Sequence, residues 1–168
     1  MIGAGIVGLA VAYKLCSKYN NILVIEKERA FGQHVSSRNS EVIHSGLYYE
    51  VDSLKARLCV RGNQLMYDFA KQYGINYKNC GKIIAVSDPG EIDKLEALMQ
   101  NGEQNNVEGL ELISGAEVSQ REPIIRAVGG LVVPSTGIID SHGFMHKLEY
   151  LITSNESTTV YNTEVTDI

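Results

Sequence analysis

The chain has 168 residues, of which 44% are hydrophobic and 21% are charged, and its formal net charge at pH 7 is −5. This length suffices for one domain with a sizeable core or for most of two small domains. The negative charge and the absence of a run of Lys and Arg argue against a nucleic-acid partner. No stretch reaches the roughly 18 apolar residues of a membrane span, and the N-terminus lacks the features of a signal peptide. We therefore expect a cytoplasmic protein without an integral membrane segment, with peripheral attachment to a membrane as an alternative.

The first eight residues, MIGAGIVG, join a two-residue apolar stub to a Gly-x-Gly-x-x-Gly turn. In such a turn Gly3 permits the tight bend, Gly5 lets the backbone approach a pyrophosphate, and Gly8 lets the next helix lie close to the sheet. The apolar, alanine-rich residues 6–17 predict that helix. A dinucleotide pyrophosphate would lie at its positive N-terminal end.

A second element supports this interpretation, since residues 22–25 read as a strand that ends at Glu26. An acid about 20 residues beyond the glycine turn is placed to accept hydrogen bonds from an adenosine ribose hydroxyl, and it disfavours a 2′-phosphate. The pattern predicts FAD or NAD rather than NADP.

The next segment, residues 27–40, has neither helical nor strand periodicity and ends in Ser37, Arg38, Asn39 and Ser40. Loops that follow the carboxyl ends of strands in an open α/β sheet line the ligand crevice, so we expect these four residues to contact the cofactor. The alternative is a solvated loop. His44 follows between aliphatic residues, a setting that suits either a hydrogen-bonded core residue or a catalytic group.

The remaining chain predicts further helices and strands. Leu54, Leu58, Leu65 and Phe69 predict an amphipathic helix over residues 53–73, capped by Ser53 and ended by Gly74. Strands are expected at residues 82–86, 110–113, 129–133, 158–161 and 164–168, a turn at 77–81, and helices after Asp88, after Ser114 and from Asp140 or Ser141.

His142 and His146 lie four residues apart on the last of these helices, the spacing of two metal ligands on one face. The intervening residues lack the acid of the zinc-protease motif, and no third ligand is evident. We predict no metal site.

Taken together, several segments resemble the FAD-dependent oxidoreductases of the D-amino-acid oxidase superfamily. The similarity rests on Gly3 to Gly8, Glu26, the Ser-Arg-Asn-Ser run and the Val-Ile-His-Ser-Gly-Leu-Tyr-Tyr run of residues 42–49. Within that superfamily the chain most resembles the L-2-hydroxyglutarate dehydrogenases, because it also has the Cys-Gly-Lys run of residues 80–82 and the Pro-Ser-Thr-Gly run of residues 134–137. Glycerol-3-phosphate dehydrogenases share the glycine turn and the Ile-His-Ser-Gly pattern.

The resemblance implies an α/β fold, in which a Rossmann-like FAD-binding domain carries an inserted α+β substrate domain. Residues 1–74 would form the first part of the FAD-binding domain, residues 75–140 part of the substrate domain, and residues 141–168 the return to the first domain. Members of the family have a full strand before the glycine turn and a further half of similar size. We therefore expect a fragment that is incomplete at both ends, with a truncated first strand.

The resemblance also implies a function for the full-length protein, the FAD-dependent oxidation of a 2-hydroxy acid to a 2-oxo acid by hydride transfer to flavin. Gly3, Gly5 and Gly8 would hold the pyrophosphate and Glu26 the ribose. Ser37, Arg38, Asn39 and Ser40 would lie beside the pyrophosphate, ribityl chain and flavin, and His44 would be the catalytic base or a hydrogen-bond partner of the substrate. The electron acceptor, oxygen or quinone, is left open. Alternatives are a glycerol-3-phosphate dehydrogenase-like flavoenzyme, an NAD-dependent dehydrogenase, and a binding module or truncated chain without activity.

Overall fold

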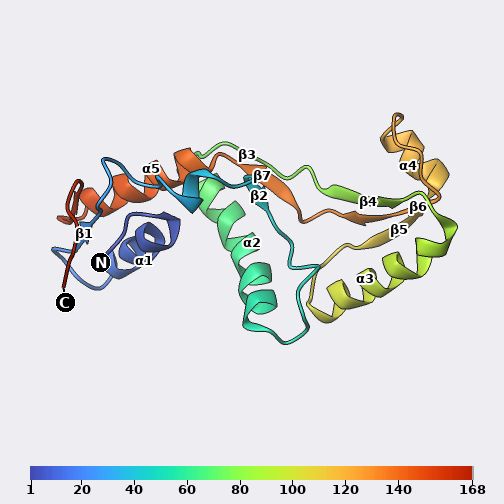
Figure 1. Cartoon of the computed structure of the whole chain (residues 1–168), viewed down its shortest axis with the longest axis horizontal. Helices are drawn as coiled ribbons and strands as arrows, with labels where there is room; N and C mark the ends of the chain where they lie inside the picture. Colours follow the sequence, from blue (N-terminus) through green and yellow to red (C-terminus); the bar gives the residue numbers. More distant parts are fainter. Residues whose placement is uncertain (168) are drawn as a thin grey trace. The chain divides into compact units, whose positions relative to one another are not determined.

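The computed structural model describes residues 1–167 and divides them into two compact units (Figure 1). The first unit comprises Met1–Glu41, Tyr73–Asn76 and residues 139–167, and the second comprises Val42–Gln72 and Tyr77–Ile138. Both units combine helices with strands, so the predicted α/β class is confirmed. Within residues 1–167 no helix has the length and apolar character needed to cross a bilayer.

The first unit contains a short parallel sheet. Strand β1 (Leu23–Ile25) pairs in parallel with β8 (Thr158–Val160), with Val24 opposite Thr159. On its other side β1 meets the N-terminal stub, because Ile2 forms a parallel bridge with Ile25. The Ile25 N–H donates to Met1 O at 2.9 Å, and the Gly3 N–H donates to Ile25 O at 2.8 Å. The stub therefore keeps the register of a parallel strand up to the glycine turn.

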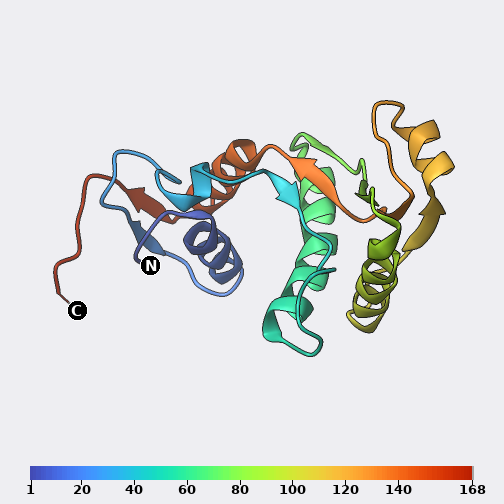
Figure 2. The same cartoon turned by 45° about the vertical axis from the view of Figure 1, so that its right-hand side comes forward.

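Two helices pack against each other in this unit, α1 (Ile6–Cys16) and α5 (Ser141–Thr153). Figures 1 and 2 both show α5 alongside α1. Helix α5 begins as predicted, since the Asp140 carboxylate accepts from the Gly143 N–H at 2.8 Å. Its apolar residues recur at helical spacing and are buried, as are those of α1 and β1 that face them. The resulting core consists of Leu9, Ala12, Val24, Phe144, Met145, Leu148 and Ile152.

The second unit is built on a three-stranded antiparallel sheet. Its strand order is β4 (Lys82–Val86), β6 (Gly129–Val133), β5 (Glu111–Ser114), with Ile84 opposite Leu131. Helix α3 (Ile92–Gln104) follows a 3₁₀ turn (Pro89–Glu91) and covers one face of the sheet (Figure 1). Side chains alternate between the two faces of a strand, so every second residue points to α3. The core on that face consists of Leu47, Leu95, Val107, Leu131 and Val133.

A second sheet in this unit has the order β2 (Val42–Ile43), β7 (Gly137–Ile139), β3 (Tyr77–Lys78). Two more helices belong to the unit, α2 (Leu54–Tyr73) and α4 (Gly115–Arg121). The predicted caps of both are present. Ser53 Oγ accepts from the Ala56 N–H at 3.1 Å, and Ser114 and Glu117 form a reciprocal capping box.

Three details of the sequence-based prediction are wrong. No strand occurs at residues 164–167, and Ile168 of that prediction lies outside the described residues. Tyr77–Lys78 form a strand in a segment predicted to be a turn, because they pair at the edge of the second sheet. In α2 the three leucines of the periodic stripe are 55–65% exposed, whereas Ala56 and Ala70 are buried.

The compact units also divide the chain at other places than the predicted domain boundaries, since α2 groups with Tyr77–Ile138. Compactness alone does not say which unit binds the cofactor. The assignment of an FAD-binding and a substrate domain therefore stays a prediction.

Candidate functional site

The glycine turn places three backbone segments of the first unit in close contact. Gly3 has a φ of +92°, which only glycine adopts readily, and this bend turns the chain from the stub into α1. A Cβ on Gly8 would overlap with the Gly3 carbonyl oxygen, so the first turn of α1 lies directly against the bend. The first N–H groups of a helix have no intrahelical acceptor. In this arrangement they and the helix dipole face the loop that follows β1.

That loop reaches the start of α1 through Ser36. Its Oγ accepts from the Ile6 N–H at 3.0 Å, and a Cβ on Gly5 would approach the same oxygen to 3.2 Å. Ser36 therefore supplies the cap that Gly5, at the N-cap position, cannot supply itself. The sequence-based prediction missed this residue. Its only signal was the neighbouring pair of serines, which does not tell which hydroxyl faces the helix.

Glu26 lies at the carboxyl end of β1 and is 9% exposed. Its Oε2 accepts from the Ala4 N–H at 2.6 Å and its Oε1 from the Glu28 N–H at 3.0 Å. Burial by itself would raise the pKa of this carboxyl, but the N–H groups of Glu28, Ala4 and Lys27 outweigh it and lower the pKa. An ionised carboxylate has more acceptor sites than these amides occupy. Glu26 therefore retains capacity to accept from hydroxyl groups beside the glycine turn.

The four other loop residues predicted to contact the cofactor are exposed. Asn39 orders the end of the loop, since its Nδ2 donates to Ser36 O at 2.8 Å and its Oδ1 accepts from the Glu41 N–H at 2.8 Å. The loop belongs to the same unit as the glycine turn and Glu26. The residues that the structure groups there are Gly3, Gly5, Gly8, Glu26, Ser37, Arg38, Asn39 and Ser40.

His44 belongs to the second unit, directly after β2. Ile43 before it is 2% exposed and Leu47 after it is 1% exposed, whereas the His44 side chain is exposed. No side chain among residues 1–167 hydrogen-bonds the imidazole, so His44 is not the satisfied core histidine of the alternative interpretation. The buried neighbours anchor the backbone on both sides of His44, and the nitrogens of its exposed imidazole are available to a ligand.

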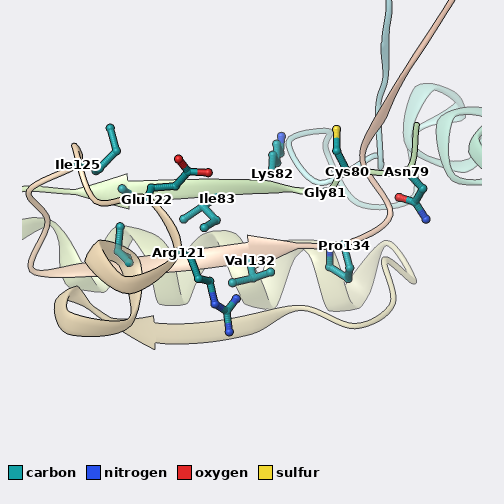
Figure 3. A pocket seen from close by; sticks show the side chains of 12 residues that line it. Asn79, Cys80, Gly81, Lys82, Ile83, Arg121, Glu122, Ile125, Val132 and Pro134 are labelled. Atoms are coloured by element: carbon teal, nitrogen blue, oxygen red, sulfur yellow. The ribbon is translucent and has the colours of Figure 1, made fainter. Parts of the chain in front are cut away.

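A cavity of about 830 Å³ lies in the second unit (Figure 3). Ile83, Ala85 and Val132 line it, and by strand alternation they point to the sheet face opposite α3. The charged residues that line it are Lys82, Arg121 and Glu122, and the Arg121 guanidinium lies 3.4 Å from the Glu111 carboxylate. The Lys82 ammonium donates to the Tyr48 hydroxyl at 3.3 Å and lies 4.3 Å from the centroid of that ring. Lys82 thus lines the cavity, while its ammonium contacts the segment that carries His44.

No group of three or more His, Cys, Asp or Glu side chains suited to a metal occurs within residues 1–167. His142 and His146 lie instead against the Phe31 ring, with centroid distances of 5.1 and 6.4 Å. Phe31 itself is 8% exposed. Both histidines are exposed on α5 and contact one aromatic ring of the first unit.

The family model for FAD dependent oxidoreductases (DAO) matches residues 1–168, which is the whole chain. The chain belongs to this family. FAD is the cofactor of FAD dependent oxidoreductases, so the choice between FAD and NAD that the glycine turn left open is decided for the family.

Several curated relatives of this FAD dependent oxidoreductase are named L-2-hydroxyglutarate dehydrogenase. The mitochondrial protein of Arabidopsis thaliana is 46% identical over 148 residues, which cover 88% of this chain and 31% of the relative. The Escherichia coli (strain K12) protein is 36% identical over 170 residues, covering 100% of this chain and 40% of the relative. The chain thus spans about a third of the length of the curated relatives it matches.

Solved structures of two oxidases show the same fold. The L-alpha-glycerophosphate oxidase of Mycoplasma pneumoniae, dithionite reduced and with FAD bound, has a TM-score of 0.92 at 28% identity over 99% of this chain and 44% of that protein. Glycine oxidase of Geobacillus kaustophilus has a TM-score of 0.85 at 21% identity over 99% of this chain and 46% of its own.

Proposed function

We propose that the complete polypeptide containing this chain oxidises L-2-hydroxyglutarate to 2-oxoglutarate with FAD. The observation that carries the proposal is the 36–46% identity to proteins named L-2-hydroxyglutarate dehydrogenase, over 83–100% of the chain. The geometry of the glycine turn and Glu26 supports the cofactor part of the proposal independently, since both suit a dinucleotide.

The first unit fits FAD in two respects. The close contact between Gly8 and Gly3 keeps side chains away from the N-terminus of α1, where backbone amides and the helix dipole favour a pyrophosphate. The buried, ionised Glu26 suits an adenosine ribose. We assign the pyrophosphate to Gly3, Gly5 and Gly8, with Ser36 as an additional contact. Ser37, Arg38, Asn39 and Ser40 would lie along the pyrophosphate, ribityl chain and flavin.

The chemistry that this chain contributes is proton removal. Oxidation of a 2-hydroxy acid removes the C2 hydrogen with its electron pair and the hydroxyl hydrogen as a proton. FAD, when bound, supplies the acceptor for the electron pair. We assign the proton to the exposed imidazole of His44, which accepts it as a general base. The substrate carboxylates are the natural partners of cationic side chains such as Lys82, whose ammonium contacts the segment that carries His44.

An assay with two substrates and an artificial electron acceptor tests the proposal. Turnover of L-2-hydroxyglutarate well above that of glycerol 3-phosphate supports it. The reverse preference would favour a glycerol-3-phosphate oxidising flavoenzyme, a second candidate that the structural similarity to L-alpha-glycerophosphate oxidase supports. Activity that requires added NAD, with no bound flavin, would contradict both.

The physiological electron acceptor of the complete polypeptide is oxygen or quinone. Comparing the rates with the two acceptors in the same assay distinguishes them. The cytoplasmic location also stays a prediction. Several relatives are named as mitochondrial proteins, whereas the Escherichia coli relative is not.

A further inference from the structure

Asparagine amides hold the backbone of the segment that carries His44. On α3, Asn101 Nδ2 donates to Leu47 O at 2.7 Å and to Tyr49 O at 3.0 Å. Asn105, also near the end of that helix, donates to the carbonyls of Gly46 and Tyr49 at 3.2 and 2.8 Å. These bonds lie beyond His44 in the chain. They fix residues 46–49, whereas two side chains of α2 bond the His44 carbonyl, Asn63 and, through its Sγ at 3.5 Å, Cys59.

Of these two side chains, Asn63 also bonds a second segment. Its Nδ2 donates to His44 O at 3.0 Å and to Ser135 O at 2.8 Å. The two amide hydrogens are therefore both used, one on the His44 segment and one on the turn between β6 and β7. Tyr67, one helical turn further along α2, donates its hydroxyl to the same Ser135 carbonyl at 3.1 Å.

The neighbouring hydroxyls do not provide a second connection. Ser45 Oγ and Ser135 Oγ are buried and have no hydrogen-bond partner among residues 1–167. Ile43 and Gly137 are the last paired residues of β2 and β7 on this side, and Ser45 and Ser135 lie two residues beyond them. Beyond the last strand pair, Asn63 is thus the side chain within the described chain that bonds both segments.

We propose that Asn63 is a positioning residue, which sets the location of the His44 imidazole by tying the His44 carbonyl to the Ser135 turn. The proposal rests on the proposed role of His44 as a base. A primary amide suits the task because it has two N–H donors for two carbonyl acceptors. An aspartate of nearly the same size has only acceptors when ionised, so it would repel both carbonyls and release the segment.

A double-mutant cycle on the complete polypeptide tests this, with flavin reduction by L-2-hydroxyglutarate measured anaerobically under single-turnover conditions. Asn63→Asp should lower the limiting rate constant about 10- to 100-fold, since small misplacement of a reacting group has costs of this order. In a His44→Ala background the same substitution should change the rate less than about twofold, because the group that Asn63 positions is then absent. An equal fall in both backgrounds, or no fall with His44 present, would overturn the inference.

Asn101→Asp is the matched control, because it also removes an amide that bonds two carbonyls of the same segment. It should lower thermal stability similarly and leave the limiting rate of the folded, flavin-loaded protein within about twofold of the wild type, since it does not contact His44. A fall as large as that of Asn63→Asp would contradict a specific role for Asn63.

If Asn63→Asp does not fold, Tyr67→Phe gives the same comparison with a milder change. It removes one hydrogen bond to Ser135 O, so we expect a fall of about threefold with His44 present and none in its absence. Equal effects in both backgrounds would again overturn the inference. Wild-type flavin that L-2-hydroxyglutarate does not reduce would refute the proposed function itself, and undiminished reduction in His44→Ala would refute the role of His44 and this inference together.

Discussion

Gly8 is the residue at which the site leaves no room for a side chain. A Cβ there would overlap with the Gly3 carbonyl oxygen, so Gly8→Ala must push α1 away from the bend. We expect it to destabilise the protein by about 1–3 kcal/mol, the usual cost of overpacking, and to reduce bound flavin. Urea unfolding and the flavin content of the purified complete polypeptide measure the two effects.

Gly62→Ala is the control for this change. Gly62 lies inside α2, and no atom comes within 4 Å of a Cβ built on it. Because Ala is favoured over Gly in a helix by about 0.5–1 kcal/mol, this variant should be at least as stable as the wild type. A Gly8→Ala protein as stable and as yellow as Gly62→Ala would show that the close approach is not needed.

Glu26 predicts a pH dependence of stability. Burial raises the pKa of this carboxyl, but the backbone N–H groups outweigh burial, so its folded-state pKa lies below the ordinary value of a glutamate. The stability that it contributes is therefore fully present above the unfolded pKa and is lost as the pH falls through the folded pKa. As the pH falls below about 5, the free energy of unfolding should therefore fall more steeply for the wild type than for Glu26→Gln. Parallel pH profiles of the two proteins would contradict this account.

At the scale of elements, helix α5 depends on a cap from a distant residue. Glu41 Oε1 accepts from the Ser141 N–H at 3.0 Å and from Ser141 Oγ at 2.7 Å, at the first turn of the helix. Glu41 holds this position with a φ of +55°, a left-handed conformation that is unfavourable for most residues. The two bonds and the helix dipole explain why an acid occupies the position.

Glu41→Ala should therefore destabilise the protein by about 0.5–2 kcal/mol, the range for loss of a helix cap. Glu96→Ala, at an exposed position inside α3, should change the stability by less than about 0.5 kcal/mol. Chemical denaturation of both variants against the wild type measures the difference. Equal stability of the two variants would rule out a capping role for Glu41.

Some features of the helices and strands could be predicted from the sequence, and others could not. The glycine turn, Glu26 and the caps at Ser53, Asp140 and Ser114 were predictable because each rests on local backbone chemistry. The burial of α2 was not, since periodicity identifies a helix but not the face that its neighbours cover. Ser36 was missed for a related reason, because only tertiary contact selects one hydroxyl of an adjacent pair.

At the scale of the whole molecule, the chain shares its fold with FAD-dependent enzymes of more than twice its length. Apolar side chains remain exposed around the short sheet of the first unit, with Ile2 at 55% and Leu23 at 46%. Binding FAD would order the residues around the glycine turn, and this ordering has a conformational-entropy cost. Because Ile2 and Leu23 stay exposed, their burial does not offset that cost. We predict that the isolated 168 residues bind FAD weakly and do not turn over, as measured by flavin titration and steady-state assay. Purification with stoichiometric flavin would contradict this.

The contacts that hold the His44 segment could not be predicted from the sequence either. The sequence named His44 as a candidate, and the structure adds an exposed imidazole between two buried neighbours. The asparagines that hold the segment come from positions 19 to 59 residues further along the chain. Their role depends on side-chain contacts between separate helices and loops, which neither spacing nor composition encodes.

In the proposed function, FAD held by this chain accepts electrons from L-2-hydroxyglutarate in the complete polypeptide. The most direct measurement of this electron transfer is the visible flavin spectrum under anaerobic conditions before and after addition of L-2-hydroxyglutarate, without any other acceptor. We predict that the oxidised-flavin band bleaches and that 2-oxoglutarate forms in an amount equal to the flavin reduced. A purified protein without a flavin band, or a band that persists in excess L-2-hydroxyglutarate, would contradict the account.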